Sequence, residues 1–173
     1  MQRAGDGPNE WLVSNADLLP VSGVALDVVC GRGRNALWLA ERGLAVHAVD
    51  RDAAALASLR ESAAAAGVVI ETEIVDLETG RVPLDDSRYD AIVVVHYLHR
   101  PLFPHLIAAL RPGGVLVYET FTIAQARRGR PTDPAFLLQP GELVSLATGL
   151  EPLAMREGTF ADRDVASLVA RKP

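Results

Sequence analysis

The sequence has little cysteine, few aromatic residues and no long apolar run. Its one cysteine, Cys30, can form neither an intramolecular disulfide nor a cysteine metal cluster, and no histidine or carboxylate set has metal-ligand spacing. No apolar stretch reaches the ~18 residues that a membrane span needs. Residues 1–9 lack the basic start and apolar stretch of a signal peptide, so we expect a cytoplasmic protein.

Positive charge is also in deficit. Lysine and arginine total 17 against 22 aspartate and glutamate residues, a formal net charge of −5, and no basic block is present. Aromatic residues are 5% of the chain and do not alternate with basic ones. Affinity for nucleic acid grows with each phosphate neutralised, so this balance predicts no nucleic-acid partner. The 173 residues are enough for one domain with a buried core.

Short valine-rich runs alternate with alanine- and leucine-rich stretches of helical period. Runs typical of strands covered on both faces lie at 24–29, 44–49, 68–75, 91–95 and 114–118. Helical stretches lie at 35–42, 53–66, 101–110 and 140–149. This order predicts an α/β fold with a doubly wound, mostly parallel, Rossmann-like sheet of about seven strands.

The pattern changes after Gly149. Residues 150–155 and 167–171 are two extended runs joined by a polar turn at 161–164, with no helix between them. We expect a C-terminal antiparallel hairpin on the edge of the sheet. The domain division predicted is a short N-terminal segment, 1–20, and a single domain, 21–173.

Ligands of such sheets bind outside the carboxyl ends of the strands. The first strand passes through a turn containing Gly31 and Gly33 directly into a helix, whose free N–H groups attract anionic groups. Asp50 closes the second strand and can accept both hydroxyls of a ribose, and Asp76 closes the third. Each feature alone also has a purely structural explanation. Together they predict an adenosine-containing ligand.

The spacing Gly31-x-Gly33-x-x-Ala36 also satisfies a relaxed dinucleotide fingerprint. A nicotinamide-dependent reductase normally needs a second half-sheet or a substrate domain, and this chain has no residues left for one. The terminal hairpin does not fit that class either.

From about Val21 onward the chain resembles class I S-adenosylmethionine (SAM)-dependent methyltransferases, and within them the small tellurite-resistance-type branch. The residues that carry the resemblance are Leu26–Asn35, Val49–Asp50, Val75–Leu77, Leu110–Gly114 and the C-terminal hairpin.

The resemblance implies SAM as cofactor and S-adenosylhomocysteine (SAH) as product. Asp50 would hold the ribose hydroxyls, Asp76 would face the adenine, and His96 would flank the methyl-donor centre. The cofactor-binding set that the resemblance implies is Asp27, Cys30, Gly31, Gly33, Asp50, Arg51, Asp76, Leu77 and His96.

The chain departs from the family pattern in two places. Val29 stands where the family has a glycine or a small residue, and its side chain would crowd the methionine end of SAM. Only about twenty residues precede the first strand, where many relatives carry helices that cover the site. We therefore expect an open site, a short lid, or a lid supplied by a partner.

The acceptor side must lie after the fourth and fifth strands. Candidate catalytic residues there are His96, His99 and Glu119. A histidine has the pKa of a base near neutral pH. The alternatives are that His96 packs against the cofactor and His99 caps the next helix. Glu119 either orients an amine or pairs with an arginine of the following loop, which holds Arg127, Arg128 and Arg130.

Two further histidines are interpreted as structural. His47 lies within the second strand and is expected to be a satisfied core residue, and His105 is expected at the surface or in packing.

The leading hypothesis is a SAM-dependent methyltransferase for a small-molecule acceptor, such as a thiol, a chalcogen oxyanion or another soft or anionic nucleophile. The alternative is a SAM- or adenosine-binding domain without catalysis that acts as a regulatory or partner subunit. No metal and no membrane contact are expected, and the oligomeric state stays open, a homodimer included.

Overall fold

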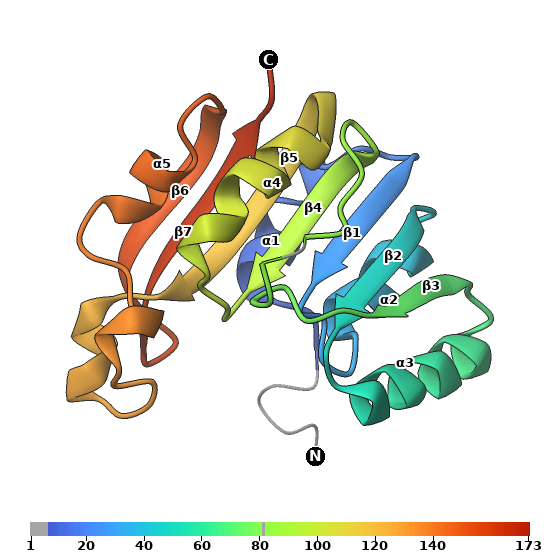
Figure 1. Cartoon of the computed structure of the whole chain (residues 1–173), viewed down its shortest axis with the longest axis horizontal. Helices are drawn as coiled ribbons and strands as arrows, with labels where there is room; N and C mark the ends of the chain where they lie inside the picture. The colour runs from blue at the N-terminus through green and yellow to red at the C-terminus, as the bar shows by residue number, and fades with distance from the viewer. Residues whose placement is uncertain (1–6, 81) are drawn as a thin grey trace.

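A seven-stranded sheet runs through the molecule, with strand order β3-β2-β1-β4-β5-β7-β6 and helices on both faces (Figure 1). The computed structural model describes residues 7–80 and 82–173. Strands β1 to β5 are parallel neighbours, and β7 runs antiparallel to both β5 and β6. The predicted doubly wound sheet with a C-terminal antiparallel hairpin at its edge is therefore confirmed.

The elements follow one another in the order that the sequence predicts. Their bounds are α1 Glu10–Ser14, η1 Ala16–Leu18, β1 Val24–Val28, α2 Arg34–Glu41, β2 Ala45–Asp50, α3 Ala53–Ala66, β3 Ile70–Ile74, β4 Tyr89–Val95, η2 Arg100–Leu102, α4 Phe103–Ala109, β5 Leu110–Phe121, η3 Ile123–Arg127, η4 Pro134–Phe136, α5 Glu142–Leu146, β6 Glu151–Phe160 and β7 Arg163–Arg171.

Several predicted elements differ in extent from the observed ones. The predicted strand 114–118 is part of the longer β5, Leu110–Phe121. The hairpin strands are longer than predicted, because the turn contains only Ala161 and Asp162, both with positive φ (46° and 61°). Such two-residue turns match the twist of paired strands, so pairing continues up to the turn. The predicted helix 140–149 is reduced to α5, and the predicted helix 101–110 is the short η2 followed by α4.

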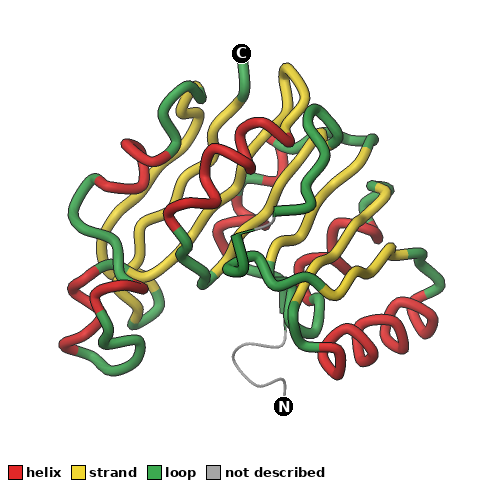
Figure 2. Tube along the Cα trace, viewed as in Figure 1, coloured by secondary structure: helices red, strands yellow, loops and turns green. Residues whose placement is uncertain are grey.

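The carboxyl ends of the parallel strands meet at one edge of the sheet. In Figure 1 the arrowheads of β1, β4 and β5 point to the lower edge, and Figure 2 shows loops gathered there. The segment 122–141 projects on one side of this edge and α3 lies on the other. The predicted ligand-binding edge is thus flanked from both sides.

The segment before β1 packs against the sheet. Trp11 and Leu12 of α1 are buried in the same apolar cluster as Leu39 of α2 and Val93 of β4. The side chain of Asn9 caps α1 by accepting from the Leu12 N–H at 3.1 Å. The division into 1–20 and 21–173 stays a prediction.

Lys172, the only lysine of the chain, binds backbone carbonyls at the C-terminal end of α4. The Lys172 Nζ donates to the carbonyls of Ile107, Ala108 and Leu110 at 2.8, 3.3 and 2.7 Å. Ile107 and Ala108 lie in the last turn of α4 and Leu110 is its C-cap residue, where helix carbonyls lack intrahelical donors. Lys172 therefore ties the end of β7 to the helix that packs on the sheet.

In the described part of the chain, no helix has both the length and the apolar character needed to cross a bilayer. Nor do the described residues contain a group of three or more histidine, cysteine or acidic side chains placed to hold a metal ion.

Candidate functional site

The turn after β1 contains three residues with left-handed backbone. Val29, Gly31 and Gly33 have φ of 54°, 54° and 77°. A Cβ on Gly33 would lie 2.2 Å from a methyl carbon of Leu59, so this glycine lets α3 pack closely. A Cβ on Gly31 would meet nothing within 4 Å, so that face of the turn is open. Gly33 thus serves packing, and Gly31 leaves room beside the start of α2.

Val29 is the residue in this turn that does not suit its conformation. A β-branched residue with positive φ is rare and costs roughly 1–2 kcal/mol. The glycine of the family pattern would adopt the same φ without this cost. The predicted departure at Val29 is therefore also a strained position in the structure.

Asp50 holds the turn in place. Its Oδ2 accepts from the Gly31 N–H at 2.7 Å, and its Oδ1 accepts from the Asp52 N–H at 2.9 Å. Asp50 is buried, and Cys30 next to the turn donates its N–H to the Val49 carbonyl at 3.0 Å. A carboxylate has about four acceptor positions, so Asp50 retains lone pairs for a ligand.

Asp27 lies beneath the turn with one carboxylate oxygen unsatisfied. The residue is 1% exposed, and its Oδ2 has no hydrogen-bond partner. Burial raises the pKa of Asp27 to about 7, although a backbone hydrogen bond from Ala36 and the charge of Arg34 act in the opposite direction. A buried acceptor without a donor points to a missing group, here one that donates or carries positive charge.

His96 follows β4 in an unusual conformation. Its φ is 56°, its ring stacks on Phe121 with centroids 4.7 Å apart, and its Nε2 is buried without a partner. Burial lowers the pKa of His96 to about 4, and the charges of Arg163 and Arg34 lower it further. His96 is therefore neutral at pH 7, with one ring nitrogen unbonded.

Val29 lines two separate cavities. The first, which we call the turn cavity, has a volume of about 490 Å³. It is lined by Val29, Cys30, Gly31, Arg32, Arg34, Asn35, Leu37, Ser62 and Val95. The second, the base cavity, has a volume of about 240 Å³. It is lined by Val29, Arg51, Val75, Asp76, Leu77, Glu78, Tyr97 and Phe136. Of the cofactor-binding residues expected from the sequence, Cys30 and Gly31 line the turn cavity, and Arg51, Asp76 and Leu77 line the base cavity. Asp27, Gly33, Asp50 and His96 line neither, and Val29 lines both.

A third cavity, the arginine cavity, has a volume of about 260 Å³ and includes the turn of the terminal hairpin. Its lining residues are Gly7, Pro8, Asn9, Glu10, Arg34, Glu119, Arg156, Phe160, Ala161, Arg163 and Val165. Its charge comes from three arginines and two glutamates. The side chain of Arg163 has no hydrogen-bond or ion-pair partner in residues 7–80 and 82–173, although its backbone pairs with Phe160 in the hairpin.

Glu119 accepts three hydrogen bonds from side chains. Its Oε1 accepts from the Asn9 side chain at 2.8 Å, and its Oε2 accepts from Ser167 at 2.6 Å and Arg156 at 3.2 Å. The guanidinium of Arg156 also lies over the Phe160 ring, 4.0 Å from its centroid. Glu119 therefore fixes Arg156 at the arginine cavity, and its catalytic role stays a prediction.

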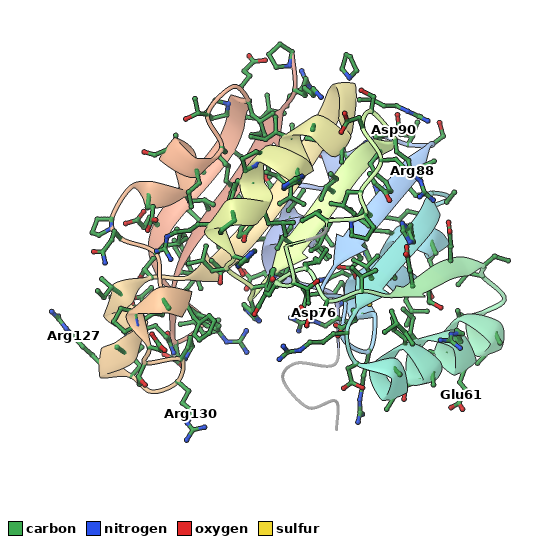
Figure 3. The ribbon with its side chains drawn as sticks, viewed as in Figure 1. Glu61, Asp76, Arg88, Asp90, Arg127 and Arg130 are labelled. Atoms are coloured by element: carbon green, nitrogen blue, oxygen red, sulfur yellow. The ribbon has the colours of Figure 1, made fainter. Side chains whose placement is uncertain are left out.

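The arginines after β5 do not gather at this site. The expected pairing of Glu119 with one of them is wrong, because Arg128 binds Asp164 at 2.5 Å instead. Figure 3 shows the side chains of Arg127 and Arg130 on the projecting segment 122–141, pointing away from the sheet and from Asp76. The hairpin register, which pairs Arg156 with Ser167 and Ser167 with Glu119, explains why the arginine comes from β6.

The other histidines follow the structural interpretation. His47 is buried, with Nδ1 2.7 Å from the Tyr89 hydroxyl and Nε2 3.1 Å from Glu73, so its prediction as a satisfied core residue is confirmed. His105 is exposed, as expected. His99 occupies the N-cap position of η2 without a side-chain cap bond, so its predicted capping hydrogen bond is absent.

Sequence reasoning missed Asn9, Tyr97, Phe136 and Arg156 as lining residues. Tyr97 lies between His96 and His99, which the sequence names as candidate catalytic residues, so it could have been found. No sequence signal marks the other three, which come from distant segments.

Comparisons with known proteins agree with this geometry. The methyltransferase domain family matches residues 25–114, more than half of the chain. Hemagglutinin 1 of Eikenella corrodens is 36% identical over 93 residues, which cover 51% of this chain and 31% of that protein. The match thus spans about a third of that relative.

Solved structures agree with the fold. TehB from Haemophilus influenzae superposes with a TM-score of 0.75 at 22% identity, covering 95% of this chain and 62% of that one. An S-adenosylmethionine dependent methyltransferase from Mesorhizobium loti has a TM-score of 0.73 at 22% identity, covering 92% and 96%. At these identities the likeness shows the fold alone. On the family match, the chain belongs to the methyltransferase domain family and is a class I SAM-dependent methyltransferase domain.

Proposed function

We propose that this domain transfers the methyl group of SAM to a small, anionic acceptor held in the arginine cavity. The observation that carries the proposal is the lining of that cavity by Arg34, Arg156 and Arg163 at the edge of the sheet where His96 lies. Guanidinium groups bind oxyanions through fixed pairs of donors. A volume of about 260 Å³ suits a small molecule.

Three of the residues present favour SAM binding, and one, Val29, disfavours it. Asp27 offers an unsatisfied buried acceptor to the ammonium end, the open face of Gly31 admits the ligand, and Asp50 keeps lone pairs for the ribose hydroxyls. Val29 lines both of the cavities that would receive the two ends of the cofactor, so its branched side chain lies where the ligand would pass from one to the other.

When bound, SAM supplies an electrophilic methyl group on a sulfonium, which an aligned nucleophile can displace directly. The chain's own residues must then hold and orient the acceptor. His96 with a pKa of about 4 is a weak base at neutral pH, and Glu119 already accepts three hydrogen bonds. This environment favours acceptors that arrive deprotonated, such as thiolates and oxyanions.

We expect Arg163→Ala to raise the KM for an anionic acceptor about tenfold while the KM for SAM stays unchanged, because one ion pair to the acceptor is lost. The measurement is SAH production with a panel of thiols and chalcogen oxyanions beside neutral alcohols and amines. Arg171→Ala is the matched control, since Arg171 closes the same strand at its other end. Turnover confined to neutral acceptors would contradict the proposal.

We expect Val29→Gly to tighten SAH binding about fivefold or more, because removal of the isopropyl group joins the two cavities at a conformation that glycine adopts freely. Calorimetric titration of wild type, Val29→Ala and Val29→Gly separates crowding from strain, since alanine removes the bulk and retains the strained Cβ. Equal affinities in all three proteins would mean that the strand end shifts to admit the ligand.

The alternative function is a SAM-binding domain without catalysis, and the observation that favours it is the branched, positive-φ Val29 that lines both cavities. Thermal unfolding distinguishes binding from its absence before any acceptor is known. SAH at ~100 times its Kd stabilises by about 2.7 kcal/mol, which raises the midpoint by roughly 5–11 °C in a domain of this size. A shift with SAH and none with NADH, followed by no turnover with any acceptor, would favour the binding domain.

A further inference from the structure

The loop between β5 and α5 places an aromatic side chain at the base cavity. Phe136, the last residue of η4, is 49% exposed, whereas Phe103 of α4 is 1% exposed. Phe136 lines the base cavity together with Tyr97. A half-exposed phenylalanine at a cavity wall has apolar surface available for a ligand.

The backbone on both sides of Phe136 is held by one arginine. The Arg100 Nη1 donates to the Ala135 carbonyl and its Nη2 to the Leu137 carbonyl, both at 3.0 Å. These are the residues immediately before and after Phe136. The same guanidinium donates to both carboxylate oxygens of Glu142, at 2.5 and 3.0 Å.

Further contacts fix the two ends of this arrangement. The Glu142 carboxylate also accepts from the Gln139 N–H at 2.8 Å, and the Arg100 guanidinium holds its pKa below the usual value. Asp133 caps η4 by accepting from the Ala135 N–H at 2.9 Å. Arg100 thus joins the loop after β4 to the segment 133–142.

Most of the other lining residues of the base cavity come from the loops after β3 and β4. Val75, Leu77 and Tyr97 contribute apolar surface, Asp76 and Glu78 contribute carboxylates, and Arg51 of the loop after β2 contributes a guanidinium. The hydroxyl of Tyr118 donates to the Tyr97 carbonyl at 2.7 Å, which holds that part of the lining. Apolar and aromatic lining with carboxylate acceptors suits a flat heteroaromatic ring that carries an amino group.

We propose that Phe136 binds the adenine ring of SAM, and that Arg100, paired with Glu142, is the positioning residue that sets Phe136 at the cavity. This inference rests on the proposed function, because it requires SAM binding. It adds a contact from the β5–α5 loop to the contacts expected from the ends of β1, β2 and β3.

The experiment measures the Kd for SAH and for methylthioadenosine, which carries the base and ribose without the amino-acid part. Phe136→Ala weakens both about tenfold, as expected for one lost stacking contact, and Phe136→Trp retains the affinity. Phe160→Ala is the matched control, because Phe160 lines the arginine cavity instead; it leaves the Kd for SAH unchanged.

The positioning role has its own readout. Arg100→Ala loses affinity about as much as Phe136→Ala, and the double variant loses no more than either single variant. Arg100→Lys, which keeps the charge but not the paired donors, gives the same result if the alanine variant fails to fold. In steady state, Phe136→Ala raises the KM for SAM and leaves the KM for the acceptor unchanged.

Two outcomes would overturn the inference. Unchanged affinity in Phe136→Ala would remove Phe136 from the site, and full additivity of the Arg100 and Phe136 losses would show that Arg100 acts independently. Absence of SAH binding in the wild-type protein is a different result, since it contradicts the proposed function itself.

Discussion

Asp50→Ala should weaken SAH binding by about a hundredfold or more. Asp50 accepts the Gly31 and Asp52 N–H groups, so its loss leaves the glycine turn without its anchor. Hydrogen bonds to a charged group contribute ~1.5–3 kcal/mol each, and tenfold in affinity corresponds to ~1.4 kcal/mol. Loss of the proposed ribose contact adds to this effect. Isothermal titration with SAH measures it.

The control for this variant is Asp52→Ala. Asp52 caps α3 by accepting from the Ala54 and Ala55 N–H groups, and it contributes ~1 kcal/mol to stability. We expect Asp52→Ala to lower the unfolding midpoint and to keep the SAH affinity within about twofold, since only helix stability changes. Unchanged affinity in the Asp50 variant would exclude Asp50 from the site.

Asp27→Asn should raise the free energy of unfolding of the ligand-free protein at pH 8 by on the order of 2–4 kcal/mol relative to the wild type. The reason is that no buried carboxylate then has to ionise. The folded-state pKa of Asp27 is raised from 3.8 to about 7. Between these values the folded protein retains a proton that the unfolded chain has released. The wild type therefore loses stability as pH rises through this window, and the loss is complete above pH 7.

The measurement is chemical denaturation of both proteins at pH 4 and pH 8. The difference should be near zero at pH 4 and largest at pH 8, whereas exposed Asp86→Asn should match the wild type at both. His96 gives the stability of the wild type a pH dependence of the opposite sign. Because its pKa is lowered from 6.5 to about 4 in the folded protein, the stability that neutral His96 contributes is lost as pH falls through that range. The variant should also bind SAH more weakly, because the carboxylate that faces the ammonium end is gone. Equal stability of the variant and wild type at pH 8 would mean that Asp27 is not desolvated in solution.

The parts of the fold that depend on local pattern could be predicted from the sequence. Valine-rich runs identified the parallel strands, because strands covered on both faces must be apolar throughout. The glycine turn and Asp50 could be placed together, since the carboxyl ends of neighbouring parallel strands share one edge. The sequence predicts that the Val29 side chain crowds the ligand, but it does not predict the left-handed backbone conformation of this residue.

Contacts that depend on pairing register could not be predicted. Arg156 reaches Glu119 because of a two-residue turn at Ala161 and Asp162, and the sequence placed a longer turn there. Phe136 reaches the base cavity because Arg100, 36 positions earlier, binds the carbonyls beside it. No local pattern encodes such a long-range bond between a side chain and the backbone.

The reactivity of the Lys172 amine measures how often the end of β7 separates from α4. Its amine is occupied by the three carbonyls at the end of α4, so an amine-reactive reagent modifies it only when the end of β7 separates from that helix. With no second lysine in the sequence, acylation of the peptide that contains Lys172 follows a single event. Its rate, measured by mass spectrometry with and without SAH, reports whether ligand binding at one edge of the sheet restrains fraying at the other.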